Sequence, residues 1–199
     1  AFPGSDNPIP PFWPVAFRDT ATQQDIELAK ELLAESGYND DNPLKLQLYV
    51  ADIHAGALEM VQAYQEMAFE AGVEIELITV PKARYWDTSW LKNPFGISAW
   101  GIRPPSQALS IAYSSDASWP ETHWFRPDYD ALLEAAAATV DGTARANLYK
   151  DAQRMLNDEG GLINLLFTRP VDAIRAECQG YAPPIPFYQR DFTTIECVR

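Results

Sequence analysis

Residues 44–79 read LKLQLYVADIHAGALEMVQAYQEMAFEAGVEIELIT and predict a strand, a helix and a second strand, in that order. Apolar side chains alternate with polar ones over 44–50 and again over 73–77, which is the pattern of strands buried on one face. Between them, apolar side chains recur at helical spacing, and Gly72 ends the helix. Two strands joined through a helix form a βαβ unit, whose strands should be parallel and whose connection should be right-handed.

A further helix and a further strand are predicted on either side of this unit. Upstream, Thr22 or Asp25 can cap a helix that ends at Gly37. This helix should pack through an apolar face that includes Leu32. Downstream, residues 95–102 are short and apolar and predict a third strand.

Two more helices and a strand are predicted in the C-terminal half. Pro127 fits the first turn of a helix, where its missing N–H leaves no hydrogen bond unmade. Thr143 can cap a longer helix that the glycine pair at 160–161 ends, and residues 162–167 then form a buried strand. Because helices and strands alternate along the chain, we expect an α/β fold with a sheet at its centre.

The two ends of the chain are rich in proline and lack periodicity. Residues 1–14 contain five prolines and should run extended, and residues 181–188 contain three more. Segments of this kind on both sides of a regular body are typical of connectors between parts of a protein.

Composition limits the class of protein. The chain has 199 residues, of which 47% are hydrophobic, so it can form one domain or one lobe of a larger protein. No apolar run approaches the roughly 18 to 20 residues of a membrane-spanning helix. The net charge of −13, with 15 basic residues scattered singly, argues against nucleic-acid binding. The sequence begins at Ala1, without an initiator methionine and without a basic-then-apolar leader, so we expect a mature or trimmed chain.

Catalytic and metal-binding motifs are weak. The segment GISAWG at 96–101 is close to a nucleophile elbow, but its second glycine comes one residue too late, so Ser98 is interpreted as a strand residue. His54 and His123 lack the i+4 partner that places two metal ligands on one helix face. His54 is predicted to be solvated or capping. We therefore expect no enzyme, no metal and no cofactor.

Aromatic side chains, at 12% of the chain, are more informative. Several of them, such as Trp86, lie in irregular segments. Trp100 ends a predicted strand, and open α/β sheets bind ligands beyond the carboxyl ends of their strands. His123 lies close in sequence to Trp119 and Trp124, and it is explained equally well as a histidine packed on indoles or as a ligand contact.

The two cysteines, Cys178 and Cys197, have neither metal-site nor CxxC spacing. In an exported protein they could pair, and a loop of this length would contribute about 3 kcal/mol. In a cytosolic protein they would be two buried thiols. The residues themselves leave both alternatives open.

Six motifs follow one another along the chain: AKELLAESGY (29–38), FEAGVEIEL (69–77), NPFGISAWGIR (93–103), RPDYDALLEAA (126–136), ARANLYKDAQRMLNDE (144–159) and CQGY (178–181). In this order they resemble the family 5 extracytoplasmic solute-binding proteins, the oligopeptide-, dipeptide- and nickel-binding components of ABC importers. Each motif is weak by itself, and their order and spacing over nearly the whole chain carry the resemblance.

The resemblance implies the C-terminal lobe of a two-lobed protein more than twice as long. Residues 1–14 would be an extended hinge-crossing segment, residues 15–180 the α/β ligand-binding lobe, and residues 181–199 a return crossing with a C-terminal strand. The lobe would be periplasmic-binding-protein-like, with a mixed, mainly parallel sheet flanked by helices. Export of such a protein also favours a disulfide between Cys178 and Cys197.

The function that the resemblance implies is import. The lobe would capture a small solute, peptide-like or carboxylate-bearing, by hinge closure and deliver it to an ABC permease in the membrane. We expect a monomer that works with the N-terminal lobe of the same parent chain, without a cofactor or nucleic acid. The protein would be periplasmic or extracellular, and held at the membrane by the transporter or by a lipid anchor on the parent.

The expected ligand contacts are Trp100 and Arg103, followed by Trp119, His123 and Trp124. Peptide-binding relatives commonly carry an Asp shortly after the strand-ending Trp, where it holds the ligand's ammonium, and this chain has Arg103 there. A guanidinium in that place could bind a carboxylate through two hydrogen bonds, or it could point to solvent or to Asp116. Arg126, in place of a usual Asn, should affect only the surface.

Two other functions use the same aromatic cluster. One is an exported hydrolase that acts on carbohydrate or peptide, and the other is a standalone carbohydrate-binding module. The parent gene separates them from the lobe, because a self-contained coding sequence of this length would argue strongly against one half of a two-lobed protein.

Overall fold

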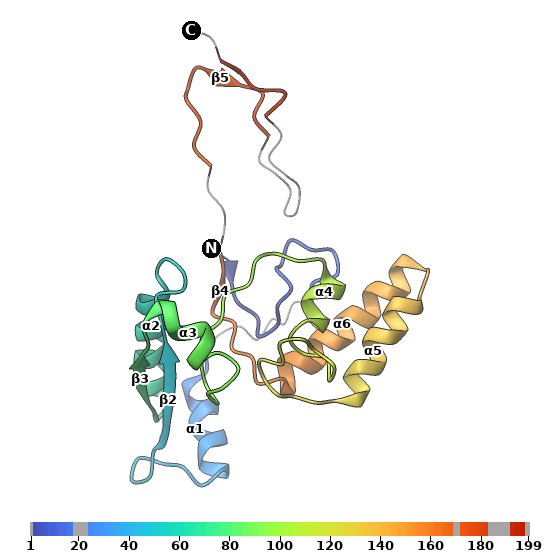
Figure 1. Cartoon of the computed structure of the whole chain (residues 1–199). Coiled ribbons are helices and arrows are strands. Elements are labelled where there is room, and N and C mark those ends of the chain that lie inside the picture. Colours follow the sequence, from blue (N-terminus) through green and yellow to red (C-terminus); the bar gives the residue numbers. More distant parts are fainter. Residues whose placement is uncertain (1, 18–23, 169–171, 183–191, 198–199) are drawn as a thin grey trace. The chain divides into compact units, whose positions relative to one another are not determined.

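The computed structural model describes residues 2–17, 24–168, 172–182 and 192–197 (Figure 1). The chain divides into two compact units. The sheet unit is Gln23–Trp100, and the helical unit combines Ala1–Thr22 with Gly101–Arg199. Each unit has its own helices and its own buried side chains.

The sheet unit is built on the βαβ arrangement that the sequence predicts. β2 (Leu44–Val50) pairs in parallel with β3 (Val73–Thr79), and α2 (Ala57–Glu70) connects them. Leu44 lies opposite Val73, and the pairing continues without a slip to the last residue of each strand. The predicted parallel pair is therefore confirmed.

One face of this sheet decides the register. Leu48 and Val50 are buried together with Ile75 of the next strand and Val61 of α2. Each buried aliphatic side chain contributes about 1.5–3 kcal/mol, and a slip of one residue would turn all of them to the opposite face. The opposite face is polar, with an ion pair of 2.9 Å between Lys45 and Glu74. Exposed pairs of this kind are worth less than about 1 kcal/mol, so the apolar face sets the alignment.

α1 (Ile26–Glu35) begins at Asp25, whose carboxylate accepts a hydrogen bond of 2.9 Å from the Leu28 N–H. Of the two predicted caps Asp25 is therefore the cap, while Thr22 lies outside the described residues. The expected packing is only partly right. No residue of α1 is fully buried, and Leu32, placed on the packed face by the sequence pattern, is 54% exposed.

The strand predicted over 95–102 is wrong in extent, because only Gly96 forms a bridge, parallel to Tyr49. The cause is the hydroxyl of Tyr85, a buried residue of α3 (Lys82–Thr88), which binds the backbone of Ile97, the residue after Gly96. The Ile97 N–H is shared between the Tyr49 carbonyl, at 3.3 Å, and the Tyr85 hydroxyl, at 2.8 Å. The Ile97 carbonyl accepts from the same hydroxyl at 2.8 Å, so the ladder ends there at a side chain instead of continuing along a strand.

The helical unit contains α4 (Pro105–Ser110), α5 (Pro127–Ala138) and α6 (Gly142–Glu159), and α5 and α6 pack against each other (Figure 1). Pro127 is in the first turn of α5, as predicted. The cap of α6 is Asp141 rather than Thr143, because its carboxylate accepts from the Ala144 N–H at 2.7 Å. The helix ends at the predicted glycine pair.

The N-terminal segment does not run extended as expected. Only β1 (Phe2–Pro3) is a strand, antiparallel to β4 (Leu166–Phe167), and turns follow it. The strand predicted over 162–167 is likewise limited to its last two residues, and they are not buried. Within the turns that follow β1, the side chain of Ile9 is buried, with an exposed fraction of 1%.

A buried glutamine fixes the end of this segment to α6. The amide of Gln153 is 0% exposed, donates to the Val15 carbonyl at 2.8 Å and accepts from the Phe17 N–H at 2.8 Å. A buried amide left unpaired would cost about 1–3 kcal/mol, so these bonds hold the chain to the helix.

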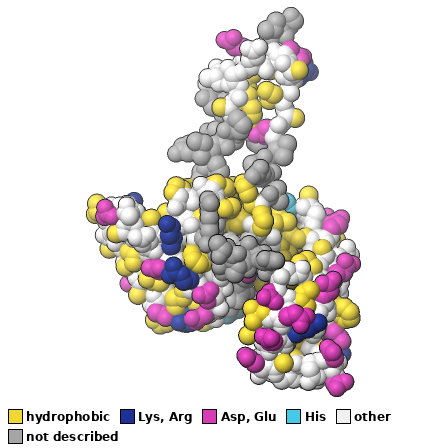
Figure 2. Space-filling model, turned by 180° about the vertical axis from the view of Figure 1, so that it is seen from behind, with side chains coloured by type: hydrophobic (Ala, Val, Ile, Leu, Met, Phe, Trp, Pro, Cys, Tyr) yellow, Lys and Arg dark blue, Asp and Glu magenta, His cyan; other side chains and the backbone are white. Residues whose placement is uncertain are grey.

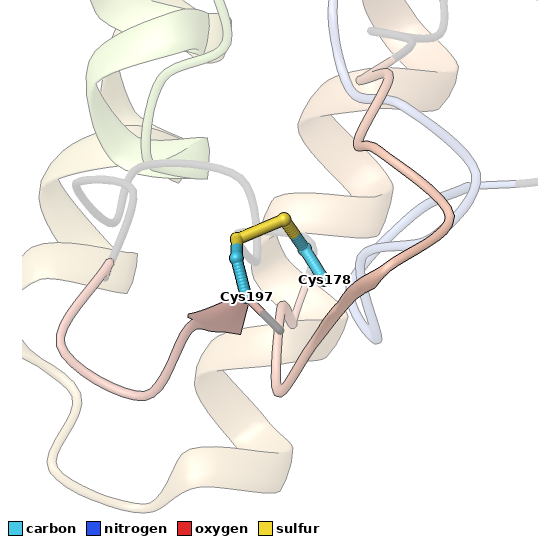
Figure 3. Close-up of a disulfide and its surroundings, with 2 residues drawn as sticks. All are labelled: Cys178 and Cys197. Carbon is cyan, nitrogen blue, oxygen red and sulfur yellow. A yellow bond between two sulfur atoms is a disulfide. The ribbon is translucent and has the colours of Figure 1, made fainter. Parts of the chain in front are cut away.

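The C-terminal segment forms a small hairpin. β5 (Cys178–Gln179) pairs antiparallel with β6 (Glu196–Cys197), and a disulfide joins the two cysteines, which lie opposite each other (Figure 3). Of the proline-rich segment 181–188, residues 183–188 lie outside the described part of the chain. The described strands thus form three two-stranded sheets, and the one with long strands is parallel.

We predict that Tyr85 and Gly96 are energetically coupled. A Cβ on Gly96 would lie 2.9 Å from the Tyr85 hydroxyl, so Gly96→Ala should destabilise the protein, and Tyr85→Phe should do so by about 1–3 kcal/mol by removing the donor to the Ile97 carbonyl. In the double variant the clash is gone. Urea unfolding of the four proteins should therefore show less than additive destabilisation, whereas strict additivity would contradict the coupling.

We also predict that the disulfide stabilises the hairpin and little else. Its two strands have two residues each, and its cysteines lie 19 positions apart. Reduction should make the region 172–197 sensitive to proteases while the cooperative melting of the rest changes little. A Cys178→Ser, Cys197→Ser variant should behave in the same way without reductant. Loss of the main transition on reduction would show that the bond supports a larger part of the fold.

Candidate functional site

The five residues predicted as ligand contacts fall in two places. Trp100 is the last residue of the sheet unit, and the other four belong to the helical unit. The sheet therefore positions Trp100, and the helices position the rest.

Trp100 lies at the edge of the sheet where the parallel strands end. The bridge between Tyr49 and Gly96 runs the segment around Gly96 alongside β2 and in the same direction. Residues 98–100 therefore continue beyond the carboxyl end of that segment, where open α/β sheets bind ligands. The side chain of Trp100 is half-buried there.

A second residue follows a strand at the same edge and was not selected from the sequence. His54 comes shortly after β2, and its ring is exposed. Its Nδ1 lies 2.9 Å from the carbonyl oxygen of Ala55, and because a carbonyl only accepts, Nδ1 carries the proton in this arrangement. Nε2 is then free to accept from a ligand. The capping role is not observed, since Gly56 is the residue at the start of α2.

The main aromatic cluster is a loop between α4 and α5. We call residues 119–125 the aromatic loop. It is tied at its start by a hydrogen bond of 3.2 Å from the Trp119 N–H to the Ile111 carbonyl. Trp119 is 38% exposed and Phe125 is 56% exposed. Large apolar rings exposed together on a loop are typical of surfaces that a ligand covers.

His123 occupies a turn in this loop. Its backbone is in the left-handed region, with φ of 47°, and its N–H donates to the Pro120 carbonyl at 3.2 Å. The ring is exposed and meets the edge of Phe125, with 6.2 Å between centroids. Phe125 is thus a neighbour that sequence reasoning missed, although its position beside Trp124 was a usable signal. As a ligand contact His123 remains a prediction.

Trp124 is held by packing on two sides. Its ring lies 5.1 Å from that of Tyr129, at 61°, and the guanidinium of Arg126 lies 5.5 Å over it. Tyr129 is buried and donates to the Leu109 carbonyl at 2.8 Å, and burial raises the pKa of its phenol. Trp124 therefore joins the loop to the core of the unit.

Arg126 lies at the surface, as expected, and there it pairs with two acidic residues. Its Nε donates to one carboxylate oxygen of Asp128 at 3.0 Å, and its Nη2 donates to the other at 2.7 Å. Its Nη1 donates to Glu159, the last residue of α6. Hydrogen bonds from this guanidinium lower the pKa of the Asp128 carboxyl below its usual value.

Arg103 lies in the segment that leads into α4, and its side chain is half-buried. Asp116, the acid considered as its neighbour, accepts a hydrogen bond of 2.7 Å from the Ser114 hydroxyl. Both interpretations of Arg103 remain predictions.

Tyr113, another aromatic residue ahead of the aromatic loop, is a core residue. It is buried, and burial raises the pKa of its phenol.

Another aromatic pair, Trp86 and Trp90, lies on and just after α3. Trp86 is 43% exposed and meets Trp90 edge to face, with 5.2 Å between centroids and 84° between planes. Tyr85, which directly precedes Trp86 in sequence, is fully buried. These three neighbouring aromatics are therefore one core residue, Tyr85, one exposed indole, Trp86, and one half-buried indole, Trp90.

The charged surface does not gather into a single site. Figure 2 shows acidic side chains spread over the visible face. A shallow depression lies on the polar face of the sheet, lined by Lys45, Leu46, Gln47, Glu74, Ile75 and Glu76. Lys45 pairs with Glu74, and Glu76 accepts a hydrogen bond from the Gln47 amide, so we do not take it as the ligand site. Among the described residues no three His, Cys, Asp or Glu side chains come together as a metal site.

None of the helices in the described parts of the chain is long and apolar enough to cross a membrane.

A parallel βαβ sheet with an aromatic side chain beyond its strand ends, together with a loop of the helical unit that exposes further aromatic rings, is typical of an α/β ligand-binding protein. The chain belongs to the bacterial extracellular solute-binding proteins of family 5, whose model for the middle region matches residues 3–120. The resemblance found from the six sequence motifs is thereby confirmed.

Curated relatives include transport proteins with different ligands. The chain is 24% identical over 180 residues to the nickel-binding protein NikA of Staphylococcus aureus, covering 88% of this chain and 37% of that protein. It is 25% identical over 171 residues to the periplasmic oligopeptide-binding protein OppA of Salmonella typhimurium, covering 82% and 31%. The chain thus spans about a third of the length of these relatives.

Solved structures agree on the fold. The crystal structure of NikA from Staphylococcus aureus in complex with Ni(L-His)2 matches with a TM-score of 0.62 and 26% identity, covering 72% of this chain and 32% of that one. HbpA2 from Haemophilus parasuis matches with a TM-score of 0.71 and 22% identity, covering 92% and 38%. The expected α/β, periplasmic-binding-protein-like fold is confirmed.

Proposed function

We propose that this chain is the C-terminal lobe of a two-lobed solute-binding protein that serves an ABC importer. Membership of family 5, together with a length of about a third of the relatives, carries the proposal. The boundaries proposed from the sequence are a crossing at 1–14, a lobe at 15–180 and a return crossing at 181–199. The other lobe would come from the same parent chain, and the protein would act as a monomer.

The mechanism is hinge closure around a solute. A ligand that contacts both lobes favours the closed form by its extra affinity for that form, and the closed form then docks on the permease. On this lobe the contacts would be Trp100, at the end of the sheet segment, and the exposed rings of the aromatic loop. Indole and phenyl faces supply contact area, and a few polar groups orient the solute.

A carboxylate is the best-supported feature of the solute. Arg103 lies three residues after Trp100, and a guanidinium binds a carboxylate through two parallel hydrogen bonds. Relatives of this chain include a probable deoxycholate-binding protein of Escherichia coli and a glutathione-binding protein of Pectobacterium atrosepticum. Both of these solutes carry carboxylates. The proposed class is therefore a small peptide-like or other carboxylate-bearing solute.

The proposed location is outside the cytoplasmic membrane. The family is described as extracellular, and OppA, at 25% identity, is named as periplasmic. The parent protein would be held near the membrane by the transporter or by a lipid anchor.

The exposed indole of Trp86 on α3 favours a second candidate, a carbohydrate-binding module. Sugars stack on indole faces, and Trp86 is 43% exposed. In that case the stacking surface lies on the sheet unit and Arg103 takes no part.

A thermal-shift screen tests both candidates on the full-length protein. Glutathione, dipeptides and tripeptides, deoxycholate, nickel with histidine, and oligosaccharides are the probes. A solute at 100 times its Kd stabilises the folded state by about 2.7 kcal/mol, which raises the Tm by several degrees. We expect a carboxylate-bearing probe to do so. If none does while one of the peptides or oligosaccharides is hydrolysed, the binding function is wrong.

Arg103→Asp tests the carboxylate contact. With a stabilising carboxylate probe from the screen, we expect affinity to fall by roughly 10- to 100-fold, because a charged hydrogen bond is lost and like charges are brought together. Arg84→Asp, an equal change of charge on the exposed surface of α3, is the control and should leave affinity nearly unchanged. Equal affinity of the Arg103 variant and the wild type would remove Arg103 from the site.

A further inference from the structure

The described backbone hydrogen bonds of the aromatic loop lie at its start and in its middle. The hydrogen bond to Ile111 fixes its start, and the left-handed backbone of His123 adds strain in its middle. Trp119 and Phe125 are exposed and contribute little burial. A loop with exposed rings and a strained turn keeps one shape only when its surroundings impose it.

Arg126 supplies that constraint from the other end of the loop. It is the residue immediately before α5, with extended backbone angles of −126° and 104°. Its guanidinium binds Asp128 in the first turn of α5 through a two-bond fork and binds Glu159 at the end of α6. The same planar group lies 5.5 Å over the ring of Trp124.

The charges suit the two helix ends that they join. The C-terminal end of α6 is partially negative, and a guanidinium beside Glu159 stabilises it. The N-terminal end of α5 is partially positive, and Asp128 stabilises it. The guanidinium of Arg126 therefore contacts the loop and both helices. Its planar donors fix the orientation of the bound carboxylate as well as its distance, which the ammonium group of a lysine would not.

We propose that Arg126 is a positioning residue that holds the aromatic loop in its ligand-binding shape by joining Trp124 to α5 and α6. This inference rests on the proposed function, in which the loop contacts the solute. The role proposed for Arg126 is indirect: three of the five N–H donors of its guanidinium bind Asp128 and Glu159, and the solute contacts the loop. A loop that is already ordered loses less conformational entropy on binding, so the solute binds more tightly.

Hydrogen exchange measured by mass spectrometry on the chain tests the proposal without a ligand. In Arg126→Ala we expect amides of residues 117–125 to exchange about three- to tenfold faster, with α5 and α6 little changed. Arg154→Ala is the matched control, since Arg154 also pairs with an acid, Asp151 at 2.8 Å, and lies 5.2 Å over a ring, that of Phe17. The control should leave 117–125 unchanged, and equal exchange in Arg126→Ala and wild type overturns the proposal.

A spectroscopic signature separates positioning from general stability. Near-ultraviolet circular dichroism sums the signals of all aromatic side chains, so the contribution of Trp124 is taken as the difference between wild type and Trp124→Phe. We expect Arg126→Ala to reduce the signal by a large part of this difference. Arg126→Lys, which keeps the charge without the fork, should restore little of it, and full recovery by lysine would overturn the role of the fork. If Arg126→Ala does not fold, Glu159→Gln removes one arm alone and should give a smaller increase in exchange over 117–125; no increase overturns the proposal.

The proposed function and the positioning role of Arg126 can be overturned independently of each other. If the full-length protein binds no solute in the thermal-shift screen, the proposed function fails, while faster exchange in Arg126→Ala still establishes the anchor. If solutes bind with the same affinity to wild type and Arg126→Ala, the function stands and the positioning role is overturned.

Discussion

The parallel alignment of β2 with β3 through one apolar face is the constraint on which the sheet unit depends. Leu48, Val50 and Ile75 must all face α2, and this requirement fixes which residues end each strand. Once the strand ends are fixed, so is the edge at which Trp100 and His54 emerge. The polar face does not determine the alignment of the strands, since its ion pair adds little energy. The position of a candidate ligand contact is therefore a consequence of hydrophobic packing on the other side of the sheet.

Polar groups then set the limits of regular structure in both units. The Tyr85 hydroxyl ends the sheet after two strands by binding the backbone of Ile97. In the helical unit the Arg126 guanidinium connects a loop to two helix ends. In each case a single side chain satisfies several groups that a longer strand or a tighter turn would otherwise have satisfied. Apolar periodicity places the elements, and these few polar side chains decide where they stop.

The sequence predicted what depends on local pattern and missed what depends on contacts between distant residues. The βαβ unit, Pro127 at the start of α5 and the glycine pair after α6 were all predictable from periodicity and local stereochemistry. The shortened third strand was not, because its cause is a tyrosine 12 residues away in the chain. The aromatic cluster was recognised, but the pattern could not distinguish the packed Trp124 from the exposed Phe125. No periodicity signals the role of Arg126, whose partner Glu159 is 33 residues distant.

The buried amide of Gln153 has a mechanical consequence. It grips the chain at Val15 and at Phe17, on the acceptor and donor groups of the backbone, near the middle of an 18-residue helix. Asn164 binds the same segment further upstream, at the Asn7 carbonyl. A pull applied to the chain ahead of Phe2 would therefore first load the β1–β4 pairing and the Asn164 contact. The Gln153 bonds would bear the load only after these contacts break, so the turns between Asn7 and Val15 are shielded from force by two anchors in series.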